Sequence, residues 1–166
     1  MKFNFIISIL IVLISIYIYC YYIFPSSISI LQSNINDFEL STLQQRQPIV
    51  INDCLQEKEK LINLWFKYNF IYPINNSNYL NEWIHNSYKY LFINPNIDKE
   101  IIIYKASNDP LPPHKDEQII AIKLKKNQSL IIPFKWKYFI DSNMESNMDI
   151  DIYGIHDYIT FFLSVF

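Results

Sequence analysis

A single glycine, Gly154, is the feature of this 166-residue sequence that most constrains its fold. Tight turns usually rely on glycine, because glycine adopts positive φ angles without steric cost. Turns in this chain must therefore be made by Asn, Asp, Ser and Pro, as in residues 73–78 and 94–96. The P-loop and the dinucleotide-binding fingerprint each need more than one glycine, so the sequence excludes both.

The composition is that of one packed domain with no basic surface. Hydrophobic residues make up 51% of the chain and aromatic residues 17%, which is too apolar for a disordered protein. Without its N-terminal segment the chain has about 140 residues, the size of one domain. The net charge is −2 and the basic residues form no stripe, so no nucleic-acid partner is predicted.

The N-terminal segment contains an uncharged run of twenty residues, FIISILIVLISIYIYCYYIF, over residues 5–24. A helix of about 20 apolar residues is long enough to cross a bilayer core. The sequence therefore predicts a transmembrane anchor over residues 1–25, with the lipid bilayer as its partner through residues 5–24. A cleaved signal peptide is the alternative, but its apolar region is normally about 7 to 15 residues long and ends at a small-x-small site.

The few charges around this run predict its orientation. Lys2 is the only basic side chain before the run, and the next one, Arg46, lies well beyond it. The positive-inside rule then predicts a single-pass membrane protein with a cytosolic N-terminus and a lumenal or external domain. Cys54 is the one cysteine outside the run, so we expect neither an internal disulfide nor a thiolate metal site.

Beyond the anchor, residues 26–41 show no sustained period and are expected to form a connector, and residues 42–166 to form the domain. Apolar spacing predicts helices over residues 55–68 and 79–91. A short strand is predicted at Ile49–Ile51, which is β-branched throughout. Later strands are predicted at residues 100–105, 118–124, 129–132, 135–140 and 158–166. Helices followed by strands favour an α+β domain with a mostly antiparallel sheet or a small barrel.

Two segments of the domain resemble cupin-like proteins related to Jumonji-C dioxygenases. QRQPIVINDCL, at residues 45–55, followed by an amphipathic helix, is similar to the opening of that family. KKNQSLIIPFKWKYFI, at residues 125–140, is similar to its late strands. The resemblance covers about half of the domain and implies a double-stranded β-helix, or a reduced version of one.

Catalytic members of that family hold iron with a His-x-Asp/Glu pair and a distal His, and they bind 2-oxoglutarate. Such a set leaves three positions of the metal open for cosubstrate and oxygen. The resemblance makes His114, Asp116 and His156 the candidate metal ligands of this chain. Tyr138, however, stands two residues after Trp136, where the distal His is expected. The His-x-Asp pair also lies too few residues before Trp136, so the departures fall on the residues that carry catalysis.

Three functions are consistent with these patterns. We favour a membrane-anchored, non-catalytic cupin-like domain that acts as a structural or interaction module, with no cofactor and a protein partner that the sequence does not name. An iron- and 2-oxoglutarate-dependent oxygenase tethered to a membrane is the first alternative, and a glycan-binding barrel is the second. The chain is rich in residues that A/T-rich codons encode, and it joins a degenerate enzyme fold to one anchor. In these features it is similar to proteins carried by large DNA viruses, which implies a virion or host intracellular membrane.

Overall fold

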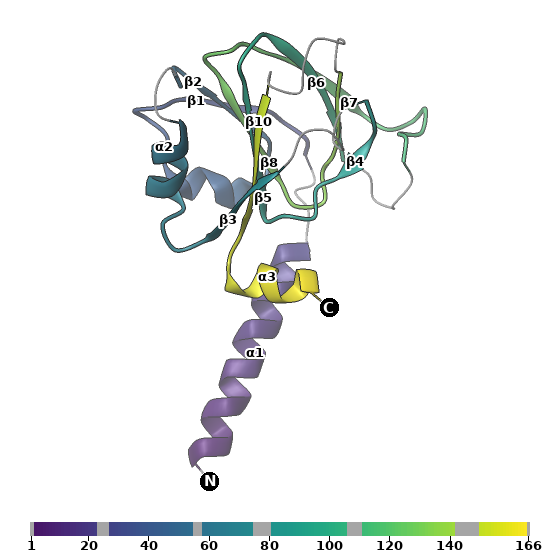
Figure 1. The fold of residues 1–166 in the computed structure, drawn as a ribbon. Helices are drawn as coiled ribbons and strands as arrows, with labels where there is room; N and C mark the ends of the chain where they lie inside the picture. Colours follow the sequence, from purple (N-terminus) through teal and green to yellow (C-terminus); the bar gives the residue numbers. More distant parts are fainter. Residues whose placement is uncertain are drawn as a thin grey trace.

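The computed structural model describes residues 2–22, 27–54, 58–74, 81–105, 111–141 and 150–165. Two facing sheets form the body of the molecule, and helix α1 projects away from them beside the C-terminal helix α3 (Figure 1). The helices are α1 (Lys2–Tyr22), the 3-10 helix η1 (Leu40–Gln45), α2 (Lys58–Trp65) and α3 (Tyr158–Val165). The strands are β1 (Leu31–Asn34), β2 (Ile49–Asn52), β3 (Phe70–Ile74), β4 (Ile84–His85), β5 (Tyr90–Pro95), β6 (Lys99–Tyr104), β7 (Ile119–Leu124), β8 (Ser129–Pro133), β9 (Lys137–Ile140) and β10 (Ile150–His156).

The order of the strands defines the architecture. One sheet has the order β1-β2-β8-β5-β10-β3 and the other has the order β4-β9-β6-β7. All neighbouring pairs are antiparallel except β1 and β2, which are parallel. Strands β3 to β10, taken in chain order, place four strands in each sheet, with first and last strands adjacent. This is the order of a double-stranded β-helix, the jelly-roll architecture of cupins, so the cupin-like fold implied by the resemblance is found in the described residues.

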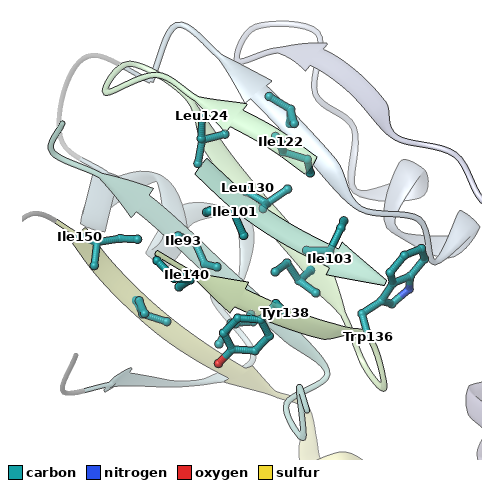
Figure 2. Packing of buried hydrophobic residues seen from close by; sticks show 14 residues of the cluster. Ile93, Ile101, Ile103, Ile122, Leu124, Leu130, Trp136, Tyr138, Ile140 and Ile150 are labelled. Carbon is teal, nitrogen blue, oxygen red and sulfur yellow. The ribbon is translucent and has the colours of Figure 1, made fainter. Parts of the chain in front are cut away.

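Apolar residues fill both sides of the six-stranded sheet. The inner cluster lies between the two sheets, and Figure 2 shows its side chains converging there from facing strands. The outer cluster lies between the six-stranded sheet and the layer of η1 and α2. Strand β2 contributes to both, because Val50 joins the inner cluster while Ile49 and Ile51 join the outer one. A strand covered on both faces has no polar positions, which explains the uninterrupted Ile-Val-Ile run.

Turns that would usually contain glycine are made by other residues. Four described non-glycine residues have positive φ angles: Arg46 at 55°, Asp53 at 63°, Asn81 at 62° and Lys135 at 67°. Asp and Asn were expected in such positions, but Arg and Lys were not. A left-handed conformation costs a non-glycine residue on the order of 1–2 kcal/mol, so neighbouring contacts must hold these two basic residues in place.

Two of the predicted elements are wrong in type. The helix predicted over residues 79–91 is instead strand β4, a turn and the start of β5, with residues 79 and 80 outside the described part of the chain. Buried Asn86 makes the turn, because its Oδ1 accepts from the N–H of Tyr88 at 3.0 Å. Its Nδ2 ties the turn to β8 by donating to the carbonyls of Ile132 and Pro133, both at 2.9 Å.

The strand predicted over residues 158–166 is helix α3. Asp157 initiates this helix, because its Oδ1 accepts a hydrogen bond of 2.7 Å from the backbone N–H of Thr160. The Thr160 hydroxyl oxygen in turn accepts from the N–H of Asp157 at 3.0 Å. This reciprocal pair is a capping box, and it outweighs the strand preference of the aromatic and β-branched residues that follow.

No helix in the described part of the chain combines the length and apolarity needed to cross a membrane. The transmembrane anchor predicted for residues 1–25 is therefore wrong. The predicted single-pass membrane localisation, with a cytosolic N-terminus and a lumenal or external domain, is wrong for the same reason.

Candidate functional site

The structure does not gather the three predicted metal ligands. His114 and Asp116 are exposed in the turn before β7, where the His114 N–H donates to Oε2 of Glu117 at 2.9 Å. His156 lies on β10 in the other sheet, is 4% exposed, and has its Nδ1 3.2 Å from the Thr160 hydroxyl oxygen. Among the residues described here, no group of three or more His, Cys, Asp or Glu side chains could hold a metal ion. The geometry therefore gives no support to an iron site at these positions.

The position expected for the distal His belongs to the hydrophobic core. Tyr138 lies on β9 opposite Ile84 of β4 and Ile103 of β6, and only 1% of it is exposed. Trp136, two residues earlier, is fully buried. Both rings are part of the inner cluster between the sheets (Figure 2). Aromatic and aliphatic side chains thus occupy the interior at the place where the resemblance implied a metal.

A cleft on the outside of the barrel is a stronger candidate for a binding site. Its volume is about 350 Å³, and it lies where α1 and η1 meet the ends of β5 and β8. Of the lining residues that the structure describes, two are cationic and none is a carboxylate. The lining residues are Tyr17, Leu43, Gln44, Arg46, Lys89, Tyr90, Pro133 and Phe134.

A polar network at the cleft connects α1 to the start of α3. The Lys89 ammonium lies 2.6 Å from Oδ2 of Asp157, and it donates to the Tyr17 hydroxyl oxygen at 2.9 Å. The Tyr17 hydroxyl also donates to Oδ2 of Asp157. Lys89 and Asp157 are each only 19% exposed, so solvent screens their attraction incompletely. Asp157 also caps α3, so its carboxylate contacts Tyr17 of α1, Lys89 just before β5 and the first turn of α3.

Burial and pairing shift the pKa values of these groups. Burial alone would raise the pKa of Asp157, but the hydrogen bonds from Lys89, the Thr160 backbone and Tyr17 outweigh it and lower the pKa to about 2. Burial would lower the pKa of Lys89, and the hydrogen bonds to Asp157 and Tyr17 reverse this into a net rise. Burial also raises the pKa values of Tyr17 and Tyr90. At neutral pH the ion pair is therefore fully charged and both phenols keep their protons.

Arg46 is fixed at the cleft by its backbone. It follows η1 in the left-handed conformation, and its N–H donates to the Leu43 carbonyl at 3.2 Å. The indole N–H of Trp136 donates to the Arg46 carbonyl, also at 3.2 Å. A buried core residue thus holds the backbone of the half-buried arginine in place.

Nothing in the sequence reasoning pointed to this cleft. Tyr17 lies inside the apolar run for which the sequence predicts a membrane anchor, and Lys89 lies in the segment for which it predicts a helix. The Asp157-x-x-Thr160 capping pattern was the one local signal available, and it indicates a helix start rather than a site.

Comparisons with known proteins add little to this description. No protein-family model matches the sequence, and a search of curated proteins finds no match. Among solved structures, the chain is similar to RmlC from Streptococcus suis, described in complex with dTDP-D-xylose, with 14% sequence identity and a TM-score of 0.28. The match spans 62% of this chain and 55% of that one. A likeness at this level carries no argument, so the cupin-like assignment depends on the strand order.

Proposed function

We propose that this chain is a non-catalytic, cupin-like interaction module. The observation that supports the first part is the filled interior of the barrel. An enzyme of the type the resemblance implies needs a hollow between the sheets, with two imidazoles and a carboxylate facing an open metal position. Here Trp136 and Tyr138 occupy that region together with isoleucines and leucines of both sheets.

The exposed apolar side chains at the other end of the molecule support the second part. Leu10 and Leu13 of α1 are 56% and 58% exposed, and Tyr158 and Phe162 of α3 are 71% and 63% exposed. The Tyr17 hydroxyl of α1 donates to Asp157 at the start of α3, so the two helices meet at this end of the molecule (Figure 1). Gathered apolar surface of this kind is characteristic of interaction sites, so we assign the contact surface to α1 and α3.

Metal content tests the non-catalytic assignment. The full chain is loaded anaerobically with Fe(II), freed of excess metal and analysed by elemental mass spectrometry, and 2-oxoglutarate turnover is measured on the same sample. We expect iron far below one atom per chain and no turnover. One iron per chain that is lost in His114→Ala, but kept in the neighbouring exposed control Lys115→Ala, would overturn the proposal.

Sedimentation velocity tests the contact surface. The full chain is expected to associate with itself as its concentration rises, because exposed apolar side chains gain about 25 cal/mol per Å² when they are buried. The double variant Leu10→Gln, Leu13→Gln should sediment as a smaller species. Leu64→Gln is the matched control, since Leu64 is 71% exposed but lies on α2. A wild-type chain that stays monomeric throughout would contradict the assignment.

A further inference from the structure

We propose that a polar depression at the β1 edge of the six-stranded sheet binds a neutral, hydroxyl-rich ligand of the size of one sugar ring. This inference goes beyond the interaction module and does not depend on it, because the depression belongs to β1 and β2 rather than to α1 and α3. Its volume is about 320 Å³, at the lower end of the range of small-molecule sites. The lining residues that the structure describes are Gln32, Ser33, Asn34, Asp37 and Asn52.

The strand pairing explains why polar side chains gather at this edge. β1 and β2 are parallel, so their carboxyl ends lie side by side. Asn34 ends β1, Asn52 ends β2, and the two residues are partners in the register. The chain then turns after β1, where the N–H of Asp37 donates to the Asn34 carbonyl at 3.0 Å. Two strand ends and one turn thus bring amides and a carboxylate together.

Apolar neighbours and hydrogen bonds hold the depression in shape. Leu31, Ile35 and Phe38 of the same segment pack on the outer cluster. The N–H of Ile35 donates to the Asn52 carbonyl at 3.2 Å, and Nε2 of Gln128 donates to Oδ1 of Asn52 at 2.7 Å. A site whose groups are already ordered loses less conformational entropy when the ligand binds.

The chemistry of the lining selects hydroxyl groups. Of the five described lining side chains, three are amides and one is a hydroxyl, and groups of these kinds both donate and accept hydrogen bonds. The fifth, Asp37, is a carboxylate with about four acceptor positions, so one bond of 3.4 Å from Nδ2 of Asn34 leaves it able to accept from two neighbouring hydroxyls. A sugar hydroxyl also donates and accepts. A ring that carries several hydroxyls therefore matches the lining, and the Asp37 charge disfavours an anion.

NMR titration of the isotope-labelled full chain with methyl glucoside, methyl galactoside and methyl mannoside, in the presence of EDTA, tests this proposal. At least one glycoside should bind with a dissociation constant of about 1–10 mM and shift the side-chain amide signals of Asn34 and Asn52. Cyclohexanol, which has a similar ring but one hydroxyl, should bind at least about tenfold more weakly, because it leaves most of the polar lining unmatched.

Three results would overturn the proposal. The first is no shift with any of the glycosides at about 50 mM, and the second is cyclohexanol binding as tightly as the best glycoside. The third is a titration without EDTA in which Ca²⁺ shifts these amides although no glycoside does, because the depression would then be a cation site.

Two matched pairs of exposed variants locate the binding. Asp37→Asn should weaken glycoside binding about tenfold, because a hydrogen bond to a charged group is lost. Glu39→Gln removes the same charge outside the described lining, so its affinity should stay within about twofold of wild type. Asn34→Ala should weaken binding about fivefold, whereas Asn36→Ala, also outside the described lining, should again stay within about twofold.

Equal weakening in both members of either pair would contradict the site. A chain that binds a glycoside at this edge but stays monomeric in sedimentation would refute the interaction module alone.

Discussion

Replacing Gly154 with alanine is expected to destabilise the protein by about 1–3 kcal/mol, the usual cost of forcing an extra carbon into a packed interior. A Cβ at this position would lie 2.3 Å from Cε1, 2.4 Å from Cδ1 and 2.7 Å from Cζ of Tyr88, whereas ordinary contacts are 3.4–4 Å. The ring would have to retreat by about 1 Å. Its movement is restricted, because it packs on the inner cluster and its centroid lies 4.9 Å from that of His156.

A double-mutant cycle isolates this clash. In a Tyr88→Ala background the obstructing ring is gone, and Gly154→Ala should then be neutral or stabilising by about 0.4–1 kcal/mol, since alanine has fewer unfolded conformations than glycine. The expected coupling energy between the two positions is therefore about 1–4 kcal/mol. Urea unfolding followed by circular dichroism measures all four proteins. Equal costs of Gly154→Ala in both backgrounds would refute the reasoning, because the penalty would then not come from the Tyr88 ring.

Three further predictions concern buried polar groups. The folded-state pKa of Asp157 is about 2 against an ordinary 3.8, so its pairing should add about 2 kcal/mol of stability above pH 4 that is lost as the pH falls toward 2. Asp157→Asn should therefore reduce the loss of stability between pH 4 and pH 2. An unchanged loss would exclude the ion pair as its cause. Asn86→Ala should cost about 2–3 kcal/mol in urea unfolding, because the carbonyls of Ile132 and Pro133 each lose a donor and the Tyr88 N–H loses its acceptor. A loss below 0.5 kcal/mol, typical of exposed sites, would count against these bonds. Burial lowers the pKa of His156, so stability should fall as the pH drops from the ordinary value of 6.5 to the lowered one; an NMR titration that finds a raised pKa would contradict this.

The strands of the second half could be predicted closely from sequence. Strands expected at residues 100–105 and 118–124 are found at Lys99–Tyr104 and Ile119–Leu124. Their signal is local, because β-branched runs bounded by polar turns specify a strand whatever the rest of the fold does.

Elements whose type depends on distant partners could not be predicted in this way. Trp83, Ile84 and Tyr88 have helical spacing. In the structure Trp83 precedes β4, Ile84 lies on it, and Tyr88 lies between the turn at Asn86 and β5. Their conformation is set by the carbonyls of β8 that Asn86 binds, more than forty residues later in the chain. Tertiary contacts of this kind override a local pattern.

The cleft could not be predicted from local sequence patterns for the same reason. It joins residues of α1, η1, β5 and the β8 end, with Asp157 at the start of α3 holding the cation. No spacing along the sequence connects Tyr17 to Lys89 or Lys89 to Asp157. Only the fold brings them within hydrogen-bonding distance, so the sequence could supply the charged residues but not their meeting point.

The proposed function depends most on a packed core in the space between the two sheets. The unfolding free energy of Tyr138→Ala tests it directly, because Tyr138 occupies the place where a ligand-binding barrel would be open. A packed interior predicts a loss of about 3–5 kcal/mol, the cost of truncating a buried aromatic ring to alanine. A loss below about 1 kcal/mol, as expected for a side chain beside an open, hydrated hollow, would contradict the packed interior and make the barrel interior the binding site.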